Sequence, residues 1–445
     1  MEEKLTRSCV CFLGSFGSGK STTIGHLITK KSKKSSGKPY GCIERDPEEM
    51  NFPKNKYVEI VDHLKTERWR GMSTNLNFQH SIECNTKHIT IISTPGHPTY
   101  FGNLIKGMSL ADASVLLVSS NAATFKETKK ITKTHIIIAR AMGVKEIIVA
   151  VNKMDECGFC EENFRKIEQK MQKMLSEKGF RRLKTQILPI SGLMGHNLVE
   201  KSKEMNWFEG KSLYDAMKSI NIPSRLLDQP FRMAVMDSYR IGGVGTVIVG
   251  KIVSGRVQPG AVIVKSPWKD HMPSNTTVHD IEYHHQRIKT AKAGDLVGIN
   301  IRHINPSDVK RGDVLGEQTN PPESCTSFTA RLLILDSPKK GIKAGFSTIL
   351  NCHTASVVCQ WTTFISKKSS KGKQEVESPS CLFSGDTALV ALTPENPVCL
   401  EPFKLFPDLG RVFIRDHNTL VAIGVVEQTF TTKPAGSGRL TKGIL

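Results

Sequence analysis

The chain has 445 residues, of which 38% are hydrophobic and 23% are charged, so it holds enough apolar residues for about three globular domains. Its apolar runs, such as residues 115–118, are far shorter than the roughly 18 residues of a membrane span, and its N-terminus lacks an apolar signal region. The net charge of +20 favours nucleic acid as a partner, because phosphate neutralisation by lysine and arginine releases counterions. We therefore expect a cytoplasmic protein.

Up to residue 222, short apolar segments alternate with helical ones. The pattern predicts an α/β domain with a mostly parallel sheet and helices on both faces. Strands are expected at 9–13, 88–92, 114–118, 146–151 and 187–190, and helices at 22–29, 134–142 and 161–178. Residues 30–38, rich in Lys, Ser and Gly, are expected to form a mobile loop.

After residue 222 the pattern changes to short β-rich runs separated by glycines. A proline-containing linker at 222–230 and the pair Pro321-Pro322 divide this part in two. Such spacing predicts two small antiparallel β-barrels, the second with strands at 328–335, 348–352, 387–392 and 421–427. We thus expect the α/β domain at 1–222, barrels at 223–322 and 323–433, and a short flexible tail at 434–445.

Residues 14–21 match the phosphate-binding pattern GxxxxGK[ST], between a predicted strand and a predicted helix. Its glycines let successive backbone N–H groups approach phosphate oxygens. Lys20 is expected to bridge the β- and γ-phosphates and Ser21 to hold Mg²⁺. The predicted contacts of this cradle are Gly14, Ser15, Phe16, Gly17, Ser18, Gly19, Lys20, Ser21 and Thr22.

A base-reading sequence, NKxD, follows the strand predicted at 146–151 and comprises Asn152, Lys153, Met154 and Asp155. The Asp155 carboxylate can accept two hydrogen bonds from guanine, whereas adenine has no matching donor pair. Asn152 can tie this loop to the cradle. A further contact to the guanine oxygen is expected from backbone N–H groups of Ser191, Gly192 and Leu193. These residues predict GTP rather than ATP.

The order of these motifs resembles the translational GTPases, and the chain as a whole is similar to the elongation factor 1 alpha family of eukaryotes and archaea. The resemblance is carried by GKSTTIGHLI at 19–28, TPGH at 94–97, NKMD at 152–155 and NWF at 206–208. In the barrels it is carried by YRIGGVGTV at 239–247, EYHH at 282–285, AGDLVGINI at 293–301, DVKRGDV at 308–314, NCHTA at 351–355 and SGDTALV at 384–390. It covers nearly the whole chain.

The resemblance implies GTP/GDP and Mg²⁺ as cofactors, with the γ-phosphate sensed by residues 93–97. His97 corresponds to the histidine that activates the attacking water, and Gly96 to the glycine that senses the γ-phosphate. Ser93, Thr94 and Pro95 complete that segment. Ser73 falls where the family has a Mg²⁺-binding threonine.

Two positions depart from the family pattern. Gly17 replaces an aspartate common in the cradle, and Ser93 replaces the aspartate that holds Mg²⁺ through a water. Losing an ionised hydrogen-bond partner costs about 1.5–3 kcal/mol of local interaction free energy. We therefore expect GTP binding to be preserved, with weakened Mg²⁺ retention and hydrolysis.

The resemblance also implies the partners: aminoacyl-tRNA, the ribosome and a guanine-nucleotide exchange factor, with the protein acting as a monomer. Glu282, His284 and His285 fall in the stretch that would receive the aminoacylated end of tRNA, although exposed polar residues on a barrel strand look the same in sequence. Arg302, Lys310 and Arg311 are candidates for phosphate contacts or for a solvated surface.

Two other functions stay open. One is a termination or ribosome-rescue GTPase that carries a tRNA-shaped protein; such proteins usually have long N-terminal extensions, whereas here the cradle begins at residue 14. The other is a scaffold that binds GTP without efficient hydrolysis, suggested by Ser93 and Gly17. Among the eleven cysteines, Cys157 and Cys160 form one CxxC without a second pair, and we interpret the thiols as reduced.

Overall fold

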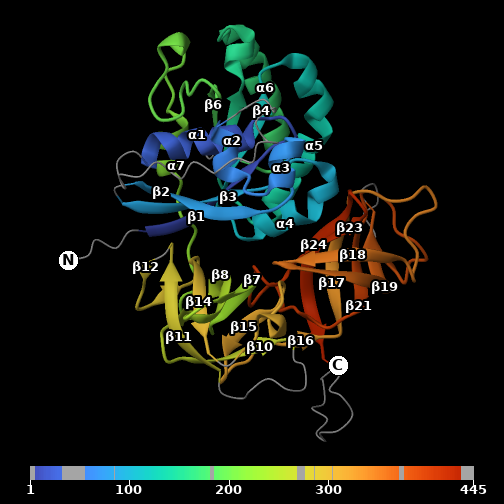
Figure 1. Cartoon of the computed structure of the whole chain (residues 1–445). Coiled ribbons are helices and arrows are strands. Elements are labelled where there is room, and N and C mark those ends of the chain that lie inside the picture. Colours follow the sequence, from blue (N-terminus) through green and yellow to red (C-terminus); the bar gives the residue numbers. More distant parts are fainter. Residues whose placement is uncertain are drawn as a thin grey trace, which may run out of the picture. The chain divides into compact units, whose positions relative to one another are not determined.

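The computed structural model describes residues 6–32, 56–84, 86–180, 185–267, 276–284, 286–302, 304–369 and 375–431 (Figure 1). They belong to two compact units, one of Met1–Asp228 with Ile281–Gly298 and one of Gln229–Asp280 with Ile299–Leu445. No helix in the described part of the chain is long and apolar enough to cross a bilayer. The predicted tail at 434–445 lies outside the described residues.

The first unit is built on a sheet in the order β2-β3-β1-β4-β5-β6 among the described residues. All neighbours pair in parallel except β2, which runs antiparallel to β3 at the edge. The mostly parallel sheet predicted from the sequence is therefore confirmed, and the edge strand β2 was not foreseen. The strands are β1 (Thr6–Leu13), β2 (Asn77–Cys84), β3 (Lys87–Ser93), β4 (Ala113–Ser119), β5 (Ile147–Asn152) and β6 (Thr185–Pro189).

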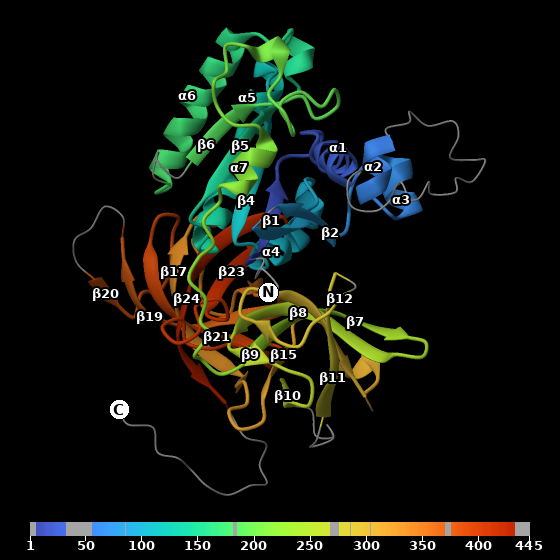
Figure 2. The same ribbon diagram turned by 90° about the vertical axis from the view of Figure 1, so that its left-hand side faces the viewer.

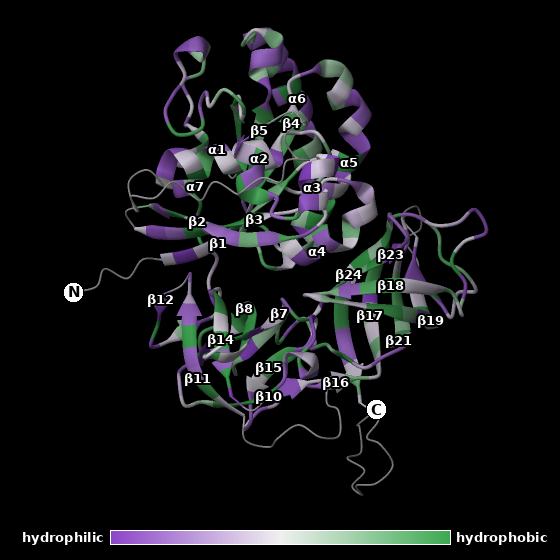
Figure 3. Cartoon of the chain, viewed as in Figure 1, coloured by the Kyte–Doolittle hydropathy of each residue, from purple (hydrophilic) through white to green (hydrophobic). Residues whose placement is uncertain are grey.

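Helices cover both faces of this sheet, as predicted. Alternate residues of a strand point to opposite faces, so Val10 and Phe12 pack on one side with buried residues of α1 and α7. On the other side, α5 packs against β4 and α6 against β5. Figure 2 shows α1 and α6 on opposite sides of the sheet, and Figure 3 shows how apolar its central strands are. The helices are α1 (Lys20–Ser32), α2 (Lys56–Val61), α3 (Lys65–Arg70), α4 (Phe101–Ser109), α5 (Ala122–Ala141), α6 (Glu161–Glu177) and α7 (Leu213–Lys218).

The loop predicted at 30–38 is wrong at its start, because residues 30–32 belong to α1. This helix buries Ile24, Leu27 and Ile28, whose spacing places them on one face. That burial extends the helix into the lysine-rich stretch. The remainder of the predicted loop lies outside the described residues.

Two closed antiparallel barrels follow, as predicted. In the first, β10-β15-β7-β8-β14-β11 form a ring closed by the β10–β11 pairing, with β12 added to β11. In the second, β18-β23-β24-β17-β21-β19 form a ring closed by β18–β19, with β20 added to β19. The first contains β7 (Arg232–Ile241), β8 (Gly245–Ser254), β10 (Val262–Ser266), β11 (Thr276–Tyr283), β12 (Gln286–Arg287), β14 (Leu296–Ile301) and β15 (Val314–Glu317), and β9 (Arg256–Val257) pairs with β13 (Ala291–Lys292).

The second barrel has its core where alternation predicts it. Phe328, Ala330, Leu332 and Ile334 of β17 are buried, while the residues between them are more exposed. Its strands are β17 (Ser327–Ile334), β18 (Ser347–Cys352), β19 (Ala355–Lys368), β20 (Glu375–Glu377), β21 (Thr387–Pro394), β23 (Arg411–Asp416) and β24 (Thr419–Phe430), and β16 (Ser324–Cys325) pairs with β22 (Val398–Cys399). The long strand β19 was not predicted, because two irregularities in its register interrupt the alternation.

Candidate nucleotide-binding site

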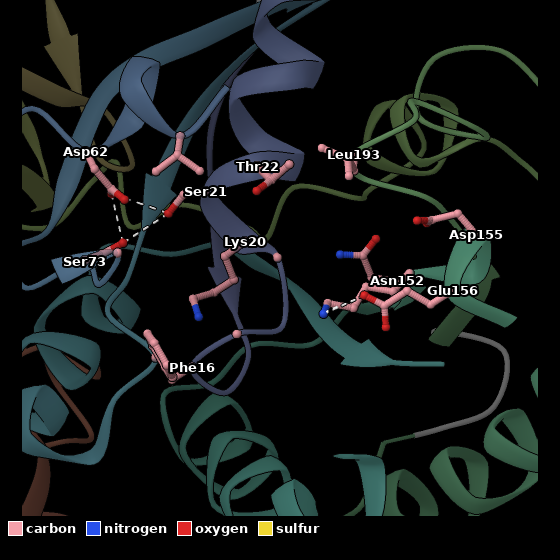
Figure 4. A pocket seen from close by; sticks show the side chains of 16 residues that line it. Phe16, Lys20, Ser21, Thr22, Asp62, Ser73, Asn152, Asp155, Glu156 and Leu193 are labelled. Carbon is pink, nitrogen blue, oxygen red and sulfur yellow. Dashed lines mark hydrogen bonds and ion pairs between the residues drawn. The ribbon is translucent and has the colours of Figure 1, made fainter. Parts of the chain in front are cut away.

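A cavity of about 320 Å³ opens in the first unit, where the loops after β1, β3, β5 and β6 meet. Ligands of open parallel sheets bind outside the carboxyl ends of the strands, which is where this cavity lies. The cavity is lined by Phe16, Gly17, Gly19, Lys20, Ser21, Thr22, Val58, Asp62, Gly71, Ser73, Gly96, Asn152, Lys153, Asp155, Glu156 and Leu193. The cradle, the base-reading loop and Ser73, which are far apart in sequence, thus share one cavity (Figure 4).

The cradle wraps the buried side chain of Lys20. Its Nζ donates hydrogen bonds to the carbonyls of Gly14, at 2.8 Å, and Ser15, at 3.0 Å. Burial lowers the pKa of Lys20 to about 8, and the nearby Asp62 carboxylate opposes that change. The negative charge of a polyphosphate beside Nζ would favour its charged form.

The predicted γ-phosphate sensor, residues 93–97, is packed directly on this cradle. The carbonyl of Gly96 accepts a hydrogen bond from the Phe16 N–H at 3.1 Å. A β-carbon at Gly96 would lie only 2.8 Å from the Gly14 carbonyl oxygen and from the Phe16 backbone nitrogen, so this close approach requires glycine. Gly96 therefore lies where a phosphate held by Lys20 would meet its backbone.

The rest of the sensor lies around the cavity rather than in its wall. Ser93 is buried at the end of β3, and the hydroxyl of the buried Thr94 donates to the Phe12 carbonyl at 2.7 Å. His97 is half-buried, and its Nδ1 accepts a hydrogen bond from the Thr99 N–H at 3.3 Å. This bond leaves Nε2 as the ring nitrogen that can meet a water.

The base-reading loop is tied to the cradle through Asn152, as predicted. Its Nδ2 donates to the Ser18 carbonyl at 2.8 Å, and its Oδ1 accepts from the Gly192 N–H at 2.8 Å. The Gly192 N–H is therefore already hydrogen-bonded to Asn152. Of the backbone N–H groups predicted to meet the guanine oxygen, the one at Leu193, which lines the cavity, is the better candidate.

The Asp155 carboxylate has an unusual environment. Its Oδ1 is buried and has no hydrogen-bond partner among the described residues. A buried acceptor without a partner costs free energy, so the arrangement suits a ligand that brings donors. Guanine brings the N1–H and the exocyclic amine. The Lys153 ammonium pairs instead with Glu156, at 2.9 Å.

At the other end of the cavity, three oxygens gather where Mg²⁺ is expected. Ser21 Oγ and Ser73 Oγ are 3.0 Å apart, and Ser73 donates to Asp62 Oδ1 at 2.8 Å. Hydroxyl and carboxylate oxygens are the ligands that Mg²⁺ prefers, so these residues fit the ion. Burial raises the pKa of Asp62 to about 6, although hydrogen bonds from Ser73 and Ser21 oppose the change.

Asp62 was not foreseen from the sequence. It follows α2 directly and belongs to no recognisable motif, so only a buried carboxylate near a helix end could have drawn attention to it. Among the described residues there is no group of three or more His, Cys, Asp or Glu side chains that could hold a metal. A Mg²⁺ site built on Ser21, Ser73 and Asp62 would therefore need further ligands, which a bound nucleotide could supply.

The residues predicted to meet tRNA are not gathered in this cavity. Glu282 is exposed on β11, and the His284 ring nitrogen Nε2 lies 2.9 Å from Thr90 Oγ1 within the first unit. Arg311 pairs with Asp237 at 2.8 Å. His285 lies outside the described residues. These assignments stay predictions.

Comparison with known proteins identifies the family. Residues 6–232 match the model of the elongation factor Tu GTP binding domain, 245–316 match elongation factor Tu domain 2, and 327–427 match the GTP-eEF1A C-terminal domain-like model. Elongation factor 1-alpha of Coccidioides immitis is 33% identical over a gapped alignment of 460 positions, which covers 99% of this chain and 98% of that protein. The chain belongs to the elongation factor 1-alpha family of GTPases.

Other similarities agree with this family and fold. Elongation factor 1-alpha-A of Schizosaccharomyces pombe is 35% identical over a gapped alignment of 453 positions, which covers 97% of this chain and 96% of that protein. Among solved structures, the S. cerevisiae Ski7 GTPase-like domain, bound to GDP and inorganic phosphate, has a TM-score of 0.73 at 17% identity and covers 95% of this chain and 97% of that one. At that identity the match supports the fold alone.

Proposed function

We propose that this elongation factor 1-alpha relative binds GTP with Mg²⁺ and, in that state, delivers aminoacyl-tRNA to the ribosomal A site. The observation that carries the proposal is the single cavity that joins a lysine cradle to a buried, unpartnered Asp155 oxygen. Asn152 bridges these two ends, so the guanine and the phosphates of one nucleotide can be held together.

In this mechanism Lys20 neutralises the β- and γ-phosphates while backbone N–H groups of the cradle surround them. Ser21 and Ser73 would hold Mg²⁺, which neutralises charge developing on the phosphate oxygens when bound. His97 orients the attacking water through Nε2. Hydrolysis awaits an external trigger, for which the ribosome is the proposed source.

Loss of the γ-phosphate would release the segment around Ser73 and Gly96, because both touch the cavity at the phosphate end. This release couples the state of the bound nucleotide to the affinity for tRNA. The proposed cargo surface includes Glu282, His284 and His285. We also propose that the protein acts in the cytoplasm as a monomer with an exchange factor, and that residues 1–222, 223–322 and 323–433 are its domains.

Two positions favour a second candidate function, a GTP-binding scaffold that hydrolyses GTP poorly. Ser93 is neutral and buried at the end of β3, where the family resemblance places a carboxylate, and Gly17 removes another from the cradle. Multiple-turnover GTP hydrolysis with programmed ribosomes separates the two functions. A working factor is stimulated strongly by the ribosome, whereas a scaffold is not.

The proposed function is tested by measuring binding of aminoacyl-tRNA and deacylated tRNA to the full chain, with GTP analogue or GDP. We expect tight binding only for aminoacyl-tRNA with the analogue. Equal binding of both tRNAs in both nucleotide states would contradict delivery. Capture of a release-factor-like protein instead of tRNA would favour a termination or rescue role.

A further inference from the structure

The oxygens of Ser21, Ser73 and Asp62 form a closed triangle at the phosphate end of the cavity (Figure 4). The separations are 3.0 Å between the two serine hydroxyls, 2.8 Å from Ser73 to Asp62 Oδ1, and 3.4 Å from Ser21 to Asp62 Oδ1. The three residues come from the start of α1, the end of α2 and the segment after α3. The fold therefore brings them together from three separate places.

These separations match the geometry of a magnesium site. Mg²⁺ holds six oxygens at about 2.0–2.1 Å in an octahedron, so two neighbouring ligands lie about 3 Å apart. The triangle thus has nearly the dimensions of one octahedral face. The same three oxygens that now bond to one another can all face one ion.

Asp62 is also suited to this task by its charge and position. Of the cavity-lining residues in the described part of the chain, the carboxylates are Asp62, Asp155 and Glu156, and the last two lie at the guanine end. The charges that act on Asp62 are Lys20, which favours its ionised form, and Glu67, which opposes it. With Gly17 and Ser93 in place of carboxylates, Asp62 supplies the negative charge at the phosphate end.

We propose that the Asp62 carboxylate is a direct ligand of Mg²⁺ in the nucleotide-bound protein and takes over the charge that Ser93 lacks. The proposal rests on the nucleotide and metal binding of the proposed function. It adds a metal ligand that directly follows α2, outside the nucleotide-binding motifs.

This ligand has a structural consequence, because Asp62 and Ser73 lie at the two ends of the segment that contains α3. The segment is braced internally: the Glu67 carboxylate accepts from the Thr74 N–H at 2.7 Å and the Asn75 N–H at 2.9 Å, and Arg68 donates to the His63 carbonyl at 2.7 Å. One ion held by Asp62 and Ser73 would fasten a preformed unit at both ends. Loss of the ion would release both ends together.

The first test measures Mn²⁺ affinity by electron paramagnetic resonance, using full-length protein loaded with a non-hydrolysable GTP analogue. We expect Asp62→Asn to weaken Mn²⁺ binding by at least about tenfold, as for other losses around metal sites. Asp336→Asn is the matched control, because Asp336 is exposed in the second unit and, within the described part of the chain, its carboxylate accepts a hydrogen bond from the adjacent Ser337 N–H. Unchanged Mn²⁺ affinity in Asp62→Asn would overturn the proposal.

Nucleotide affinity measured in EDTA separates this proposal from the proposed function. If the wild-type protein binds no guanine nucleotide, the proposed function fails. If wild type and Asp62→Asn bind GDP equally in EDTA while Mn²⁺ affinity is also equal, the function stands and only the Asp62 ligand is wrong.

A second test uses the wild-type protein and so does not depend on how the variant folds. Protein labelled with ¹³C at aspartate carboxyl groups is loaded with Mn²⁺ and the GTP analogue, and electron–nuclear double resonance detects carboxyl carbons next to the ion. We expect a strong ¹³C coupling from one directly bound carboxylate. Its absence would overturn the proposal, since Asp155 lies at the guanine end and Ser93 supplies no carboxylate.

Discussion

The two ends of the nucleotide cavity are built in different ways. At the guanine end, Asn152 and Asp155 come from one contiguous motif, and Asn152 bonds to both the cradle and the loop after β6. At the phosphate end, the negative charge comes from Asp62, which lies outside every motif and is hydrogen-bonded to Ser21 and Ser73. The proposed base-recognition site is thus local in sequence, whereas the negative charge at the proposed metal site comes from a residue outside the motifs.

This difference suggests that the two ends of the cavity respond differently to amino-acid substitution. The guanine end depends on donors and acceptors in fixed positions, so one substitution leaves a buried group unpaired. The phosphate end depends on the total charge near an ion, which carboxylates from several segments can supply. Four predictions test the contrast.

The largest effect is expected from Asp155→Asn at the guanine end. Two hydrogen bonds to a charged carboxylate are worth about 1.5–3 kcal/mol each, so GDP affinity should fall by about 100-fold or more. Xanthosine diphosphate should gain affinity, because the amide N–H₂ can donate to its C2 carbonyl. Equilibrium binding of both nucleotides measures this, and an unchanged preference for guanine would show that Asp155 does not read the base.

A pH-dependent effect is expected at the phosphate end, in nucleotide-free protein with EDTA. The pKa of Asp62 in the folded protein is raised to about 6 from an ordinary 3.8, so the folded state binds this proton more tightly than the unfolded state. The protonated Asp62 carboxyl therefore contributes stability at low pH, and that stability is lost as the pH rises through 6. Asp62→Asn should therefore be more stable than wild type at pH 7.5, by at most about 3 kcal/mol, with little difference near pH 4.

Thermal unfolding at both pH values, with Asp336→Asn for comparison, measures this difference. A gap between Asp62→Asn and wild type that does not change with pH would show that the charge on Asp62 is not the cause. A stabilised variant that also loses Mn²⁺ would show that stability is given up here for metal binding.

The third effect is expected from Ser93→Asp, which restores a carboxylate at the end of β3. The new charged partner should lower the Mg²⁺ concentration needed for half-maximal GTP turnover by about tenfold to a hundredfold. It should also make Asp62→Asn less harmful in the double variant, because either carboxylate could supply the charge. An unchanged Mg²⁺ midpoint would refute the idea that Ser93 weakens Mg²⁺ retention.

The smallest effect is expected from Glu156→Gln at the guanine end. Glu156 pairs with Lys153 at 2.9 Å, with side-chain exposures of 47% and 34%. Such exposed pairs contribute about 0.2–1 kcal/mol, so GDP affinity should change by less than about fivefold. A larger loss would show that Lys153 must be held by Glu156 to contact the base.

The sequence alone determined the strands and loops that carry the cradle and the base-reading motif. It also predicted two antiparallel barrels and the link from Asn152 to the cradle. These features depend on contiguous residues: glycines that allow close approach, apolar strands before each loop, and alternation along β17. The family matches cover nearly the whole chain and agree with that architecture.

Only the tertiary structure decided which residues complete the cavity. It placed Asp62 beside Ser21 and Ser73, showed that Asn152 already uses the Gly192 N–H, and put His284 against Thr90. No local pattern encodes these contacts, because each joins segments from different parts of the chain. Such contacts follow from how the core packs helices and strands together, and that packing fixes where a carboxylate meets its partners.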